Sequence, residues 1–266
     1  MIIDFHTHIF PSSIAEKAVS ALKASSGYEN FSDGSAEGLC FSMARSGVDI
    51  SVNMPILTKP DNFKKTNDHL LEMKQSFPDI LSFAALHPRC DGLESKVAWI
   101  KEVGFKGVKL HPFFQNEPIN SIATKKLVSL CDGAGLYTMI HPGFDASFPD
   151  VYLSEPDMIA DLLSETKATK VILAHMGGLC RWADVYDKLA GKDVFFDTSF
   201  SLDEMGEDLF LKMVEKHGSK RILFGTDSPW KDQRAYVELL KNSKLSEDQK
   251  DDILYKNAVK ILNIKV

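Results

Sequence analysis

The sequence of 266 residues has only four cysteines, Cys40, Cys90, Cys131 and Cys180, and no C-x-x-C pair. Such sparse cysteines do not indicate a disulfide framework, and we expect reduced thiols in a cytoplasmic protein. The chain also lacks a tract of Lys and Arg, and its formal net charge is -6. Because nucleic-acid binding depends on clustered positive charge, we expect no nucleic-acid partner.

Long apolar segments and nucleotide-binding motifs are missing as well. No stretch approaches the length of about 18 apolar residues that spans a bilayer, and the N-terminus lacks a basic segment followed by an apolar one. We therefore expect a soluble, unprocessed protein with no membrane partner. The first strand-to-helix unit has neither G-x-G-x-x-G nor G-x-x-x-x-G-K-[ST], which argues against a Rossmann or P-loop site. No low-complexity linker divides the chain, so we expect one domain over residues 1–266.

What the sequence does contain is a series of short apolar runs suited to buried strands. Their C-terminal ends recur about every 31 residues, which matches one strand–helix–strand step. Because the runs are continuous rather than alternating, both faces of the predicted sheet are covered. The eight runs are Ile2 to Phe5, Ile50 to Met54, Leu81 to Leu86, Gly107 to Leu110, Leu136 to Ile140, Val171 to Ala174, Val194 to Phe196 and Ile222 to Phe224.

Amphipathic helical patterns lie between these runs, with apolar residues three and four positions apart. Alternating strands and helices predict a parallel sheet, and eight units favour a closed (β/α)8 TIM barrel of the α/β class. We expect an irregular loop over the barrel mouth at 27–35 and a closing helix capped by Ser246. The helical patterns include Ser12 to Ala24, Asn62 to Phe77, Glu94 to Val103, Thr124 to Cys131, Pro156 to Glu165, Leu202 to Lys216 and Ile253 to Leu262.

Histidines gather at the ends of the predicted strands. Six of the eight do so, and in a barrel these ends converge on the mouth, where active sites lie. With a strand period of two, Asp4, His6 and His8 share one face, and two neighbouring imidazoles on an interior strand favour a metal ion. His87, in a Leu-His-Pro turn, is better explained by a hydrogen bond at the rim. The six are His6, His8, His87, His111, His141 and His175.

Other polar residues end the remaining strands. Asp227 ends the eighth run, which lies beside the first in a closed barrel, and a carboxylate next to His-x-His favours Zn²⁺ or a similar ion. Lys109 and His111 share the inward face of the fourth run, where a buried lysine needs an anion or a modification. His175 precedes two glycines that would let backbone approach a ligand. The pattern predicts one polar centre built from distant segments.

These residues together resemble the amidohydrolase superfamily, and most closely its amidohydrolase-2 branch of aminocarboxymuconate-semialdehyde decarboxylase-like metal-dependent hydrolases. The similarity extends to an Asn-Ala pair in the last helix, Asn257-Ala258. The motifs that carry it are His6-x-His8, Lys109, His141, His175-Met-Gly-Gly and Gly225-Thr-Asp227-x-Pro.

The resemblance implies a (β/α)8 barrel with Zn²⁺ or another divalent transition metal at its mouth. Carried over to this chain, it makes His6, His8, His141 and Asp227 the metal ligands, with His175 and Asp227 catalytic. In binuclear relatives a carbamylated lysine bridges two ions, so Lys109 and His175 are candidates for a second one. TatD-like nucleases usually have a glutamate where this chain has Lys109, and related lactonases work without metal.

Three functions follow as hypotheses. The first is hydrolysis of an amide, ester or lactone of a small molecule by metal-bound water, with Asp227 accepting the proton and His175 either stabilising the oxyanion or acting as acid. The second is non-oxidative decarboxylation of a small unsaturated or aromatic acid on the same scaffold. The third is a non-catalytic metal-binding barrel.

The substrate would be held at the rim of the barrel. His111, Arg181 and Trp230 are the candidate binding residues, and a substrate with a second carboxylate would need a cation such as Arg89, Arg181 or Lys231. Aromatic residues predicted near the mouth would suit a planar substrate. Nothing in the sequence decides the oligomeric state, and a homodimer stays open.

Overall fold

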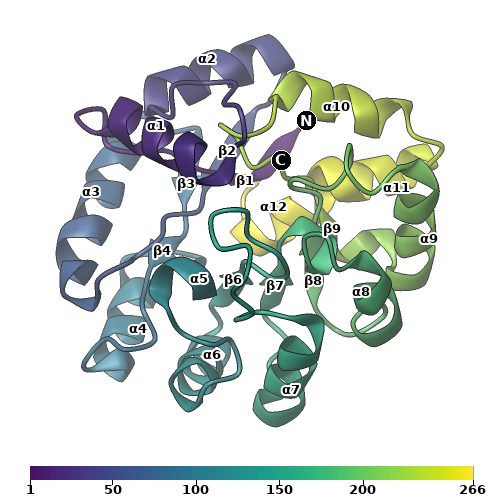
Figure 1. Ribbon diagram of the computed structural model, residues 1–266. Coiled ribbons are helices and arrows are strands. Elements are labelled where there is room, and N and C mark those ends of the chain that lie inside the picture. The colour runs from purple at the N-terminus through teal and green to yellow at the C-terminus, as the bar shows by residue number, and fades with distance from the viewer. Residues whose placement is uncertain (266) are drawn as a thin grey trace.

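A computed structural model describes residues 1–265, in which parallel strands form a ring surrounded by helices (Figure 1). The strands are β1 (Ile3–Thr7), β2 (Ile50–Asn53), β3 (Ile80–Ser82), β4 (Ala84–Ala85), β5 (Gly107–Leu110), β6 (Tyr137–Ile140), β7 (Val171–Leu173), β8 (Phe195–Asp197) and β9 (Ile222–Leu223). The strands within residues 1–265 pair in parallel, in the order β1-β2-β3 and β4 to β9.

Backbone hydrogen bonds close the two sheets into one barrel. Phe83, between β3 and β4, donates its N–H to the carbonyl of Asn53 at 3.1 Å, so β3 and β4 are one interrupted strand. On the other side, Phe5 N–H donates to the carbonyl of Phe224 at 2.7 Å, and Asp227 N–H donates to that of His6 at 2.8 Å. The result is the eight-stranded (β/α)8 barrel that the sequence predicts.

The helices confirm most of the predicted patterns. They are α1 (Ala15–Ser26), α2 (Ala36–Ser46), α3 (Phe63–Ser76), α4 (Leu93–Glu102), α5 (Pro112–Gln115), α6 (Ile122–Ala134), α7 (Pro156–Thr166), α8 (Trp182–Lys188), α9 (Glu207–His217), α10 (Gln233–Asn242), α11 (Glu247–Asp251) and α12 (Asn257–Leu262). The predicted start of α9 at Leu202 is wrong, because Gly206 has φ 76° and cannot continue a right-handed helix. Of the helices within residues 1–265, none is long and apolar enough to cross a membrane.

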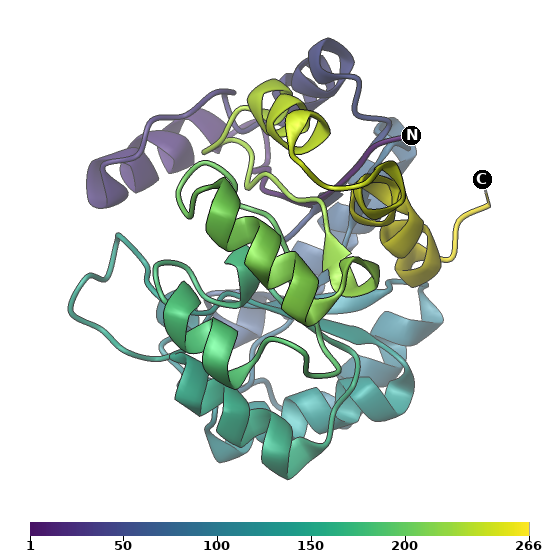
Figure 2. The same ribbon diagram turned by 90° about the vertical axis from the view of Figure 1, so that its right-hand side faces the viewer.

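Helix α12 closes the end of the barrel opposite the mouth, which we call the floor. Its Ala258, Ile261 and Leu262 belong to the same buried apolar cluster as Met139 and Leu223 of the barrel interior. Figure 2 shows α11 and α12, in yellow, at one end of the barrel and the long loop at 141–155, in teal, at the other. The predicted cap of the closing helix is confirmed, since Ser246 and Gln249 form a reciprocal capping box.

A β-bulge in β1 changes which side chains face the barrel interior. Asp4 pairs with Ser51 but Thr7 pairs with Asn53, so three steps along β1 match two along β2. Phe5 therefore packs in the interior cluster, and His6 also points inward. The prediction that Asp4 shares the inward face of His6 is wrong, because the bulge breaks the period of two.

Asp4 instead faces outward and holds three segments together. Its carboxylate accepts hydrogen bonds from Thr226 N–H at 3.0 Å, Thr226 Oγ1 at 2.6 Å and Gln233 Nε2, at the start of α10, at 2.7 Å. It also accepts from His6 N–H at 3.2 Å. Asp4 thus fixes the backbone beside both His6 and Asp227 without facing the site.

Candidate metal centre

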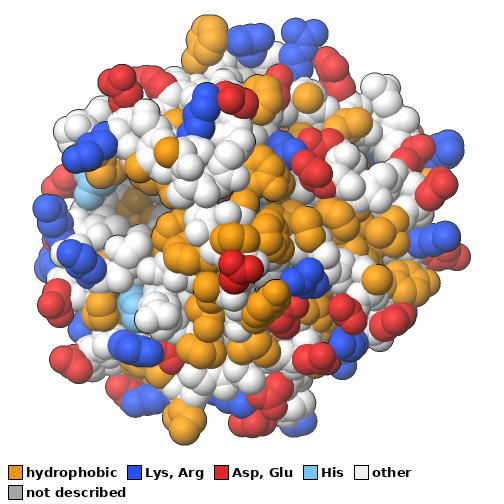
Figure 3. Space-filling model, viewed as in Figure 1, with side chains coloured by type: hydrophobic (Ala, Val, Ile, Leu, Met, Phe, Trp, Pro, Cys, Tyr) orange, Lys and Arg blue, Asp and Glu red, His pale blue; other side chains and the backbone are white. Residues whose placement is uncertain are grey.

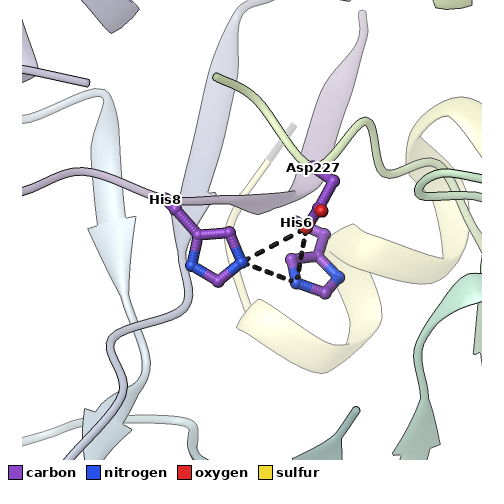
Figure 4. Close-up of side chains that lie close together, drawn as sticks. All are labelled: His6, His8 and Asp227. Atoms are coloured by element: carbon purple, nitrogen blue, oxygen red, sulfur yellow. Dashed lines mark hydrogen bonds and ion pairs between the residues drawn. The ribbon is translucent and has the colours of Figure 1, made fainter. Parts of the chain in front are cut away.

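Three predicted ligands meet at the barrel mouth: His6 from β1, His8 directly after β1, and Asp227 from the turn after β9 (Figure 4). His6 Nε2 lies 3.2 Å from His8 Nε2, and Asp227 Oδ1 lies 3.2 Å from each of these nitrogens. Asp227 Oδ1 is buried and has no hydrogen-bond donor among residues 1–265. An unpaired buried carboxylate oxygen is costly, so this donor set fits a divalent cation.

Asp197, at the end of β8, orients His6. Its Oδ2 lies 2.8 Å from His6 Nδ1, and its Oδ1 accepts hydrogen bonds from the N–H groups of His175 and Ser199 at 3.0 Å each. Burial by itself would raise the pKa of Asp197, but the neighbouring His6 and His175 and the Ser199 hydroxyl hold it at about 2. An ionised Asp197 makes His6 Nδ1 the protonated nitrogen and leaves the lone pair of Nε2 facing Asp227.

Sequence reasoning missed Asp197, although a signal exists. The residue ends the apolar run Val194 to Phe196 with a carboxylate, as Asp227 ends the next run. A buried carboxylate needs a hydrogen-bond donor or a cation as its partner. An aspartate at the C-terminal end of a buried strand is therefore a candidate for the polar site at the barrel mouth.

Lys109 is fully buried beside the same cluster. Val108 and Leu110 pack in the outer core, and Lys109 Nζ lies 3.2 Å from His6 Nε2, which confirms its predicted inward direction. Burial lowers the pKa of Lys109 to about 8, although Asp227 and Asp197 act in the opposite direction. Burial and the Lys109 ammonium together lower the pKa of His6 to about 4, so His6 is neutral.

Asp227 is the charged member of the cluster. Burial would raise its pKa, but His6 and His8 hold it well below the ordinary value for a carboxyl. The side chains of His8 and Asp227 are 14% and 11% exposed, so the cluster can be reached from the mouth. Figure 3 views this face and shows hydrophobic side chains across its centre and charged ones around its rim.

His175 connects the cluster to the next histidine. Its ring stacks on that of His6 with centroids 5.4 Å apart, and its Nε2 lies 2.9 Å from His141 Nδ1. The glycines after His175, predicted to let the backbone approach a ligand, have at least one other role. A Cβ on Gly177 would meet Val185 at 2.7 Å and Phe196 at 2.9 Å, so glycine is required there for packing.

His141, the fourth predicted ligand, lies outside the His6–His8–Asp227 cluster. It stands in a second group with His111 and Asp145, a residue that the sequence reasoning did not single out. The rings of His111 and His141 stack with centroids 4.1 Å apart. The structure therefore brings three of the four predicted ligands together, and His175 separates the fourth from them.

The candidate rim cations are each paired with a carboxylate. Arg181 donates to Glu155 at 2.8 Å, and Lys231 lies 2.6 Å from Asp203 and 2.9 Å from Glu204.

Three further rim residues also have partners. Arg89 pairs with Glu117. The Nε2 of His87 lies 3.1 Å from the carbonyl of Gln115, which confirms that this histidine bonds the rim. Trp230 is partly buried, and its backbone N–H donates to the carbonyl of Asp227 at 2.9 Å.

Comparison with known proteins finds one family and many related folds. A model of the family described as Amidohydrolase matches residues 3–264, whereas no curated protein matches the chain. The solved structure of 2,6-dihydroxybenzoate decarboxylase from Rhizobium is 15% identical, with 98% of each chain covered and a TM-score of 0.72.

Two further structures show the same fold. Dihydroxybenzoic acid decarboxylase from Polaromonas, solved with bound manganese and the inhibitor 2-nitroresorcinol, is 14% identical, with 98% of this chain and 96% of that chain covered and a TM-score of 0.70. A proposed 2-pyrone-4,6-dicarboxylic acid hydrolase from Pseudomonas putida is 15% identical over 100% of this chain and 98% of the other, with a TM-score of 0.70.

Proposed function

This chain belongs to the amidohydrolase family, and from that premise we propose that it is a metal-dependent decarboxylase of a small aromatic or unsaturated acid. The similar decarboxylase structures support the choice of reaction. The hydrolase hypothesis, which came first on sequence grounds, becomes the second candidate.

The metal would be held by His6, His8 and Asp227, whose ligand atoms face one another at 3.2 Å. Mn²⁺ and Zn²⁺ are the candidate ions, because imidazole and carboxylate suit both and a similar decarboxylase holds manganese. Such an ion would bind the substrate carboxylate and draw electron density from the bond that breaks. His141, predicted as a fourth ligand, would have to turn away from His175 and Asp145 to join this set.

The paired rim cations are the observation that carries the choice of substrate. A dicarboxylic substrate would need a free Arg or Lys, but Arg89, Arg181 and Lys231 each have an acidic partner. A monocarboxylic acid needs only the metal and the nearby Lys109 ammonium for its charge. The aromatic residues Phe114 and Phe148, whose rings meet edge to face with centroids 5.1 Å apart, suit a planar ring.

The chain's own residues would deliver the one proton that decarboxylation requires. In decarboxylation the carbon–carbon bond to the carboxylate breaks, CO₂ leaves, and the carbon keeps the electron pair and takes up a proton. His175 is the candidate proton carrier, because its Nδ1 is held by the carbonyl of Ser199 at 3.0 Å and its Nε2 contacts His141 at 2.9 Å. Asp197 and Ser199 would hold the His175 ring in place, since both bond its backbone or its ring.

Hydrolysis of an ester, lactone or amide has one observation in its favour. Asp227 Oδ1 is buried without a hydrogen-bond donor among residues 1–265, so this carboxylate oxygen can accept a hydrogen bond and then a proton from a water beside it. The experiment is to deplete purified protein of metal, reload it with Mn²⁺ or Zn²⁺, and assay both reactions. The panel contains hydroxybenzoates, unsaturated acids, lactones and esters.

Release of CO₂ from a monocarboxylic acid only after reloading is the expected result. Hydrolysis of a lactone or ester without CO₂ release would favour the second candidate. Metal binding without turnover of any compound would leave the non-catalytic barrel, and activity that does not depend on metal would contradict both enzyme hypotheses.

A further inference from the structure

We propose that Thr226, Asp4 and Gln233 form a positioning network that lies behind the metal centre and fixes its ligand Asp227. The side chains of Thr226 and Gln233 both donate to the Asp4 carboxylate, which faces outward from the barrel. The inference rests on the proposed function only in that a metal ion occupies the centre, and it applies to decarboxylation and hydrolysis alike. It makes the first turn of α10, which carries no predicted ligand, part of the structure that holds the ion.

The backbone of Asp227 is the feature that needs this support. Its φ of 71° lies in the left-handed region, which residues with a side chain rarely adopt unless the surrounding structure holds them there. The N–H of Thr226, on one side, donates to Asp4 Oδ1 at 3.0 Å, and the N–H of Ser228, on the other, donates to Thr226 Oγ1 at 3.1 Å. The hydrogen bonds that flank Asp227 therefore both end on the network.

The hydroxyl group of Thr226 is used in two directions at once. Its oxygen accepts from Ser228 N–H, and its proton is donated to Asp4 Oδ2 at 2.6 Å, because a carboxylate oxygen is the acceptor of the pair. Valine has the same branched shape as threonine but could make neither bond. Thr226→Val therefore separates the effect of the hydroxyl from the effect of packing.

One oxygen of Asp4 joins the two chain segments that carry the ligands. Asp4 Oδ1 accepts from His6 N–H at 3.2 Å and from Thr226 N–H at 3.0 Å. It thus bonds the backbone of one ligand and that of the residue before the other, Asp227. The reacting ends of the same ligands, His6 Nε2 and Asp227 Oδ1, lie 3.2 Å apart at the mouth. Their separation is therefore set from the outer side of the barrel as well as by the strands.

Gln233 completes the network from α10 and is as deeply buried as the rest. Its Nε2 donates to Asp4 Oδ2 at 2.7 Å and to Ser51 Oγ, on β2, at 3.2 Å. Asp4, Ser51, Thr226 and Gln233 are each 0% exposed. Because solvent does not reach these atoms, water cannot take the place of a partner that a substitution removes. A change in Gln233 should therefore be felt at the metal centre, although this side chain does not line it.

The test is equilibrium dialysis of metal-depleted full-length protein against Mn²⁺, at a temperature where circular dichroism shows each variant to be folded. Thr226→Val should bind Mn²⁺ about 10- to 100-fold more weakly at the same stoichiometry, which is the usual loss for a hydrogen-bonded partner of a ligand. Thr226→Ser keeps the hydroxyl and should bind as wild type does. Thr124→Val removes a hydroxyl that is 1% exposed on α6 and should leave Mn²⁺ affinity unchanged.

Gln233→Met is the second variant, since it removes the donor on α10 without altering the turn, and it should weaken Mn²⁺ binding by about 10-fold. It decides the question if Thr226→Val does not fold. A purely structural network would lower the free energy of unfolding but leave the affinity of the folded protein unchanged. An affinity equal to that of wild type in either folded variant would therefore overturn the proposal.

Two controls complete the experiment. Binding by Thr226→Ser that is as weak as that of Thr226→Val, or an equal loss in Thr124→Val, would also overturn the proposal, because the effect would then not belong to the Thr226 hydroxyl. Wild-type protein that binds no Mn²⁺ or Zn²⁺ would instead contradict the metal site of the proposed function, and this inference with it.

Discussion

The same strands form both ends of the barrel, but one end buries apolar side chains and the other buries polar and charged ones. At the floor, Leu223 and Met139 pack against Ile261 and Leu262 of α12, and this cluster is apolar. At the mouth, the next inward positions carry Lys109, histidines and carboxylates, all buried or nearly so. Stability is thus concentrated at one end, which allows the other end to hold costly polar groups close together.

Histidine shows the difference most clearly. His217 is the last residue of α9, at the floor end, and each ring nitrogen has a backbone partner: Gly191 N–H at 3.1 Å and the carbonyl of Val194 at 3.0 Å. Its ring also stacks on Phe196 at 3.8 Å. His111 at the mouth is as buried but has no such partner. A buried histidine whose ring nitrogens both have partners is structural, whereas His111 Nδ1 has no partner among residues 1–265.

The strongest test of the mouth is Asp227→Asn. Removing this carboxylate should abolish metal binding at the His6–His8–Asp227 cluster and reduce turnover on the order of 10³-fold or more, because the ion supplies several kcal/mol of catalysis. Metal content and turnover are measured together. Asp150→Asn serves as the control with an unchanged fold and an exposed carboxylate. Full activity in Asp227→Asn would contradict the proposed centre.

The matching test of the floor is Leu262→Ala. This side chain is 3% exposed within the interior cluster, so its truncation should lower the free energy of unfolding by about 2 to 5 kcal/mol. Turnover by the folded protein should stay unchanged, which separates the two ends. Ile122→Ala, at a side chain that is 89% exposed on α6, should change stability by less than about 0.5 kcal/mol. Denaturant unfolding measures both variants, and equal losses would contradict the role given to α12.

Much of this division could be predicted from the sequence. The apolar runs locate the strands because a parallel barrel buries both faces of every strand, and a polar residue at the end of a run marks the mouth. His6, His8 and Asp227 were found in this way.

Other features of the fold and of the site could not be predicted, because they depend on pairings and contacts between distant segments. The bulge in β1 is one extra residue in a pairing, and only the partner strand reveals it. Asp145 lies in an irregular loop whose path is set by tertiary contacts such as the Phe144 N–H to Leu179 carbonyl bond. Helices α2 and α10 were not singled out either, although Ser35 and Asp232 cap them.

The pH dependence of stability offers a test of the floor histidine. Burial lowers the pKa of His217 to about 4 from an ordinary value of 6.5. Between these values the unfolded chain binds the additional proton, so stability is present above pH 6.5 and is lost as the pH falls toward 4. The difference corresponds to about 3 kcal/mol. Denaturant unfolding of wild type and His217→Gln over this range should give a shallower slope for the variant, and identical slopes would contradict the assignment.

The smallest expected effect distinguishes an orienting carboxylate from a ligand. Asp197→Asn keeps the volume of the side chain but removes the charge that fixes His6 Nδ1 as the donor. Outer-shell partners of this kind contribute about 10- to 100-fold to metal affinity, so Mn²⁺ should bind more weakly by that factor and still bind at the same stoichiometry. Asp187→Asn, at an exposed position, is the control. Complete loss of the ion would make Asp197 a ligand rather than an orienting residue, and an unchanged affinity would mean that the bulge in β1 alone orients His6.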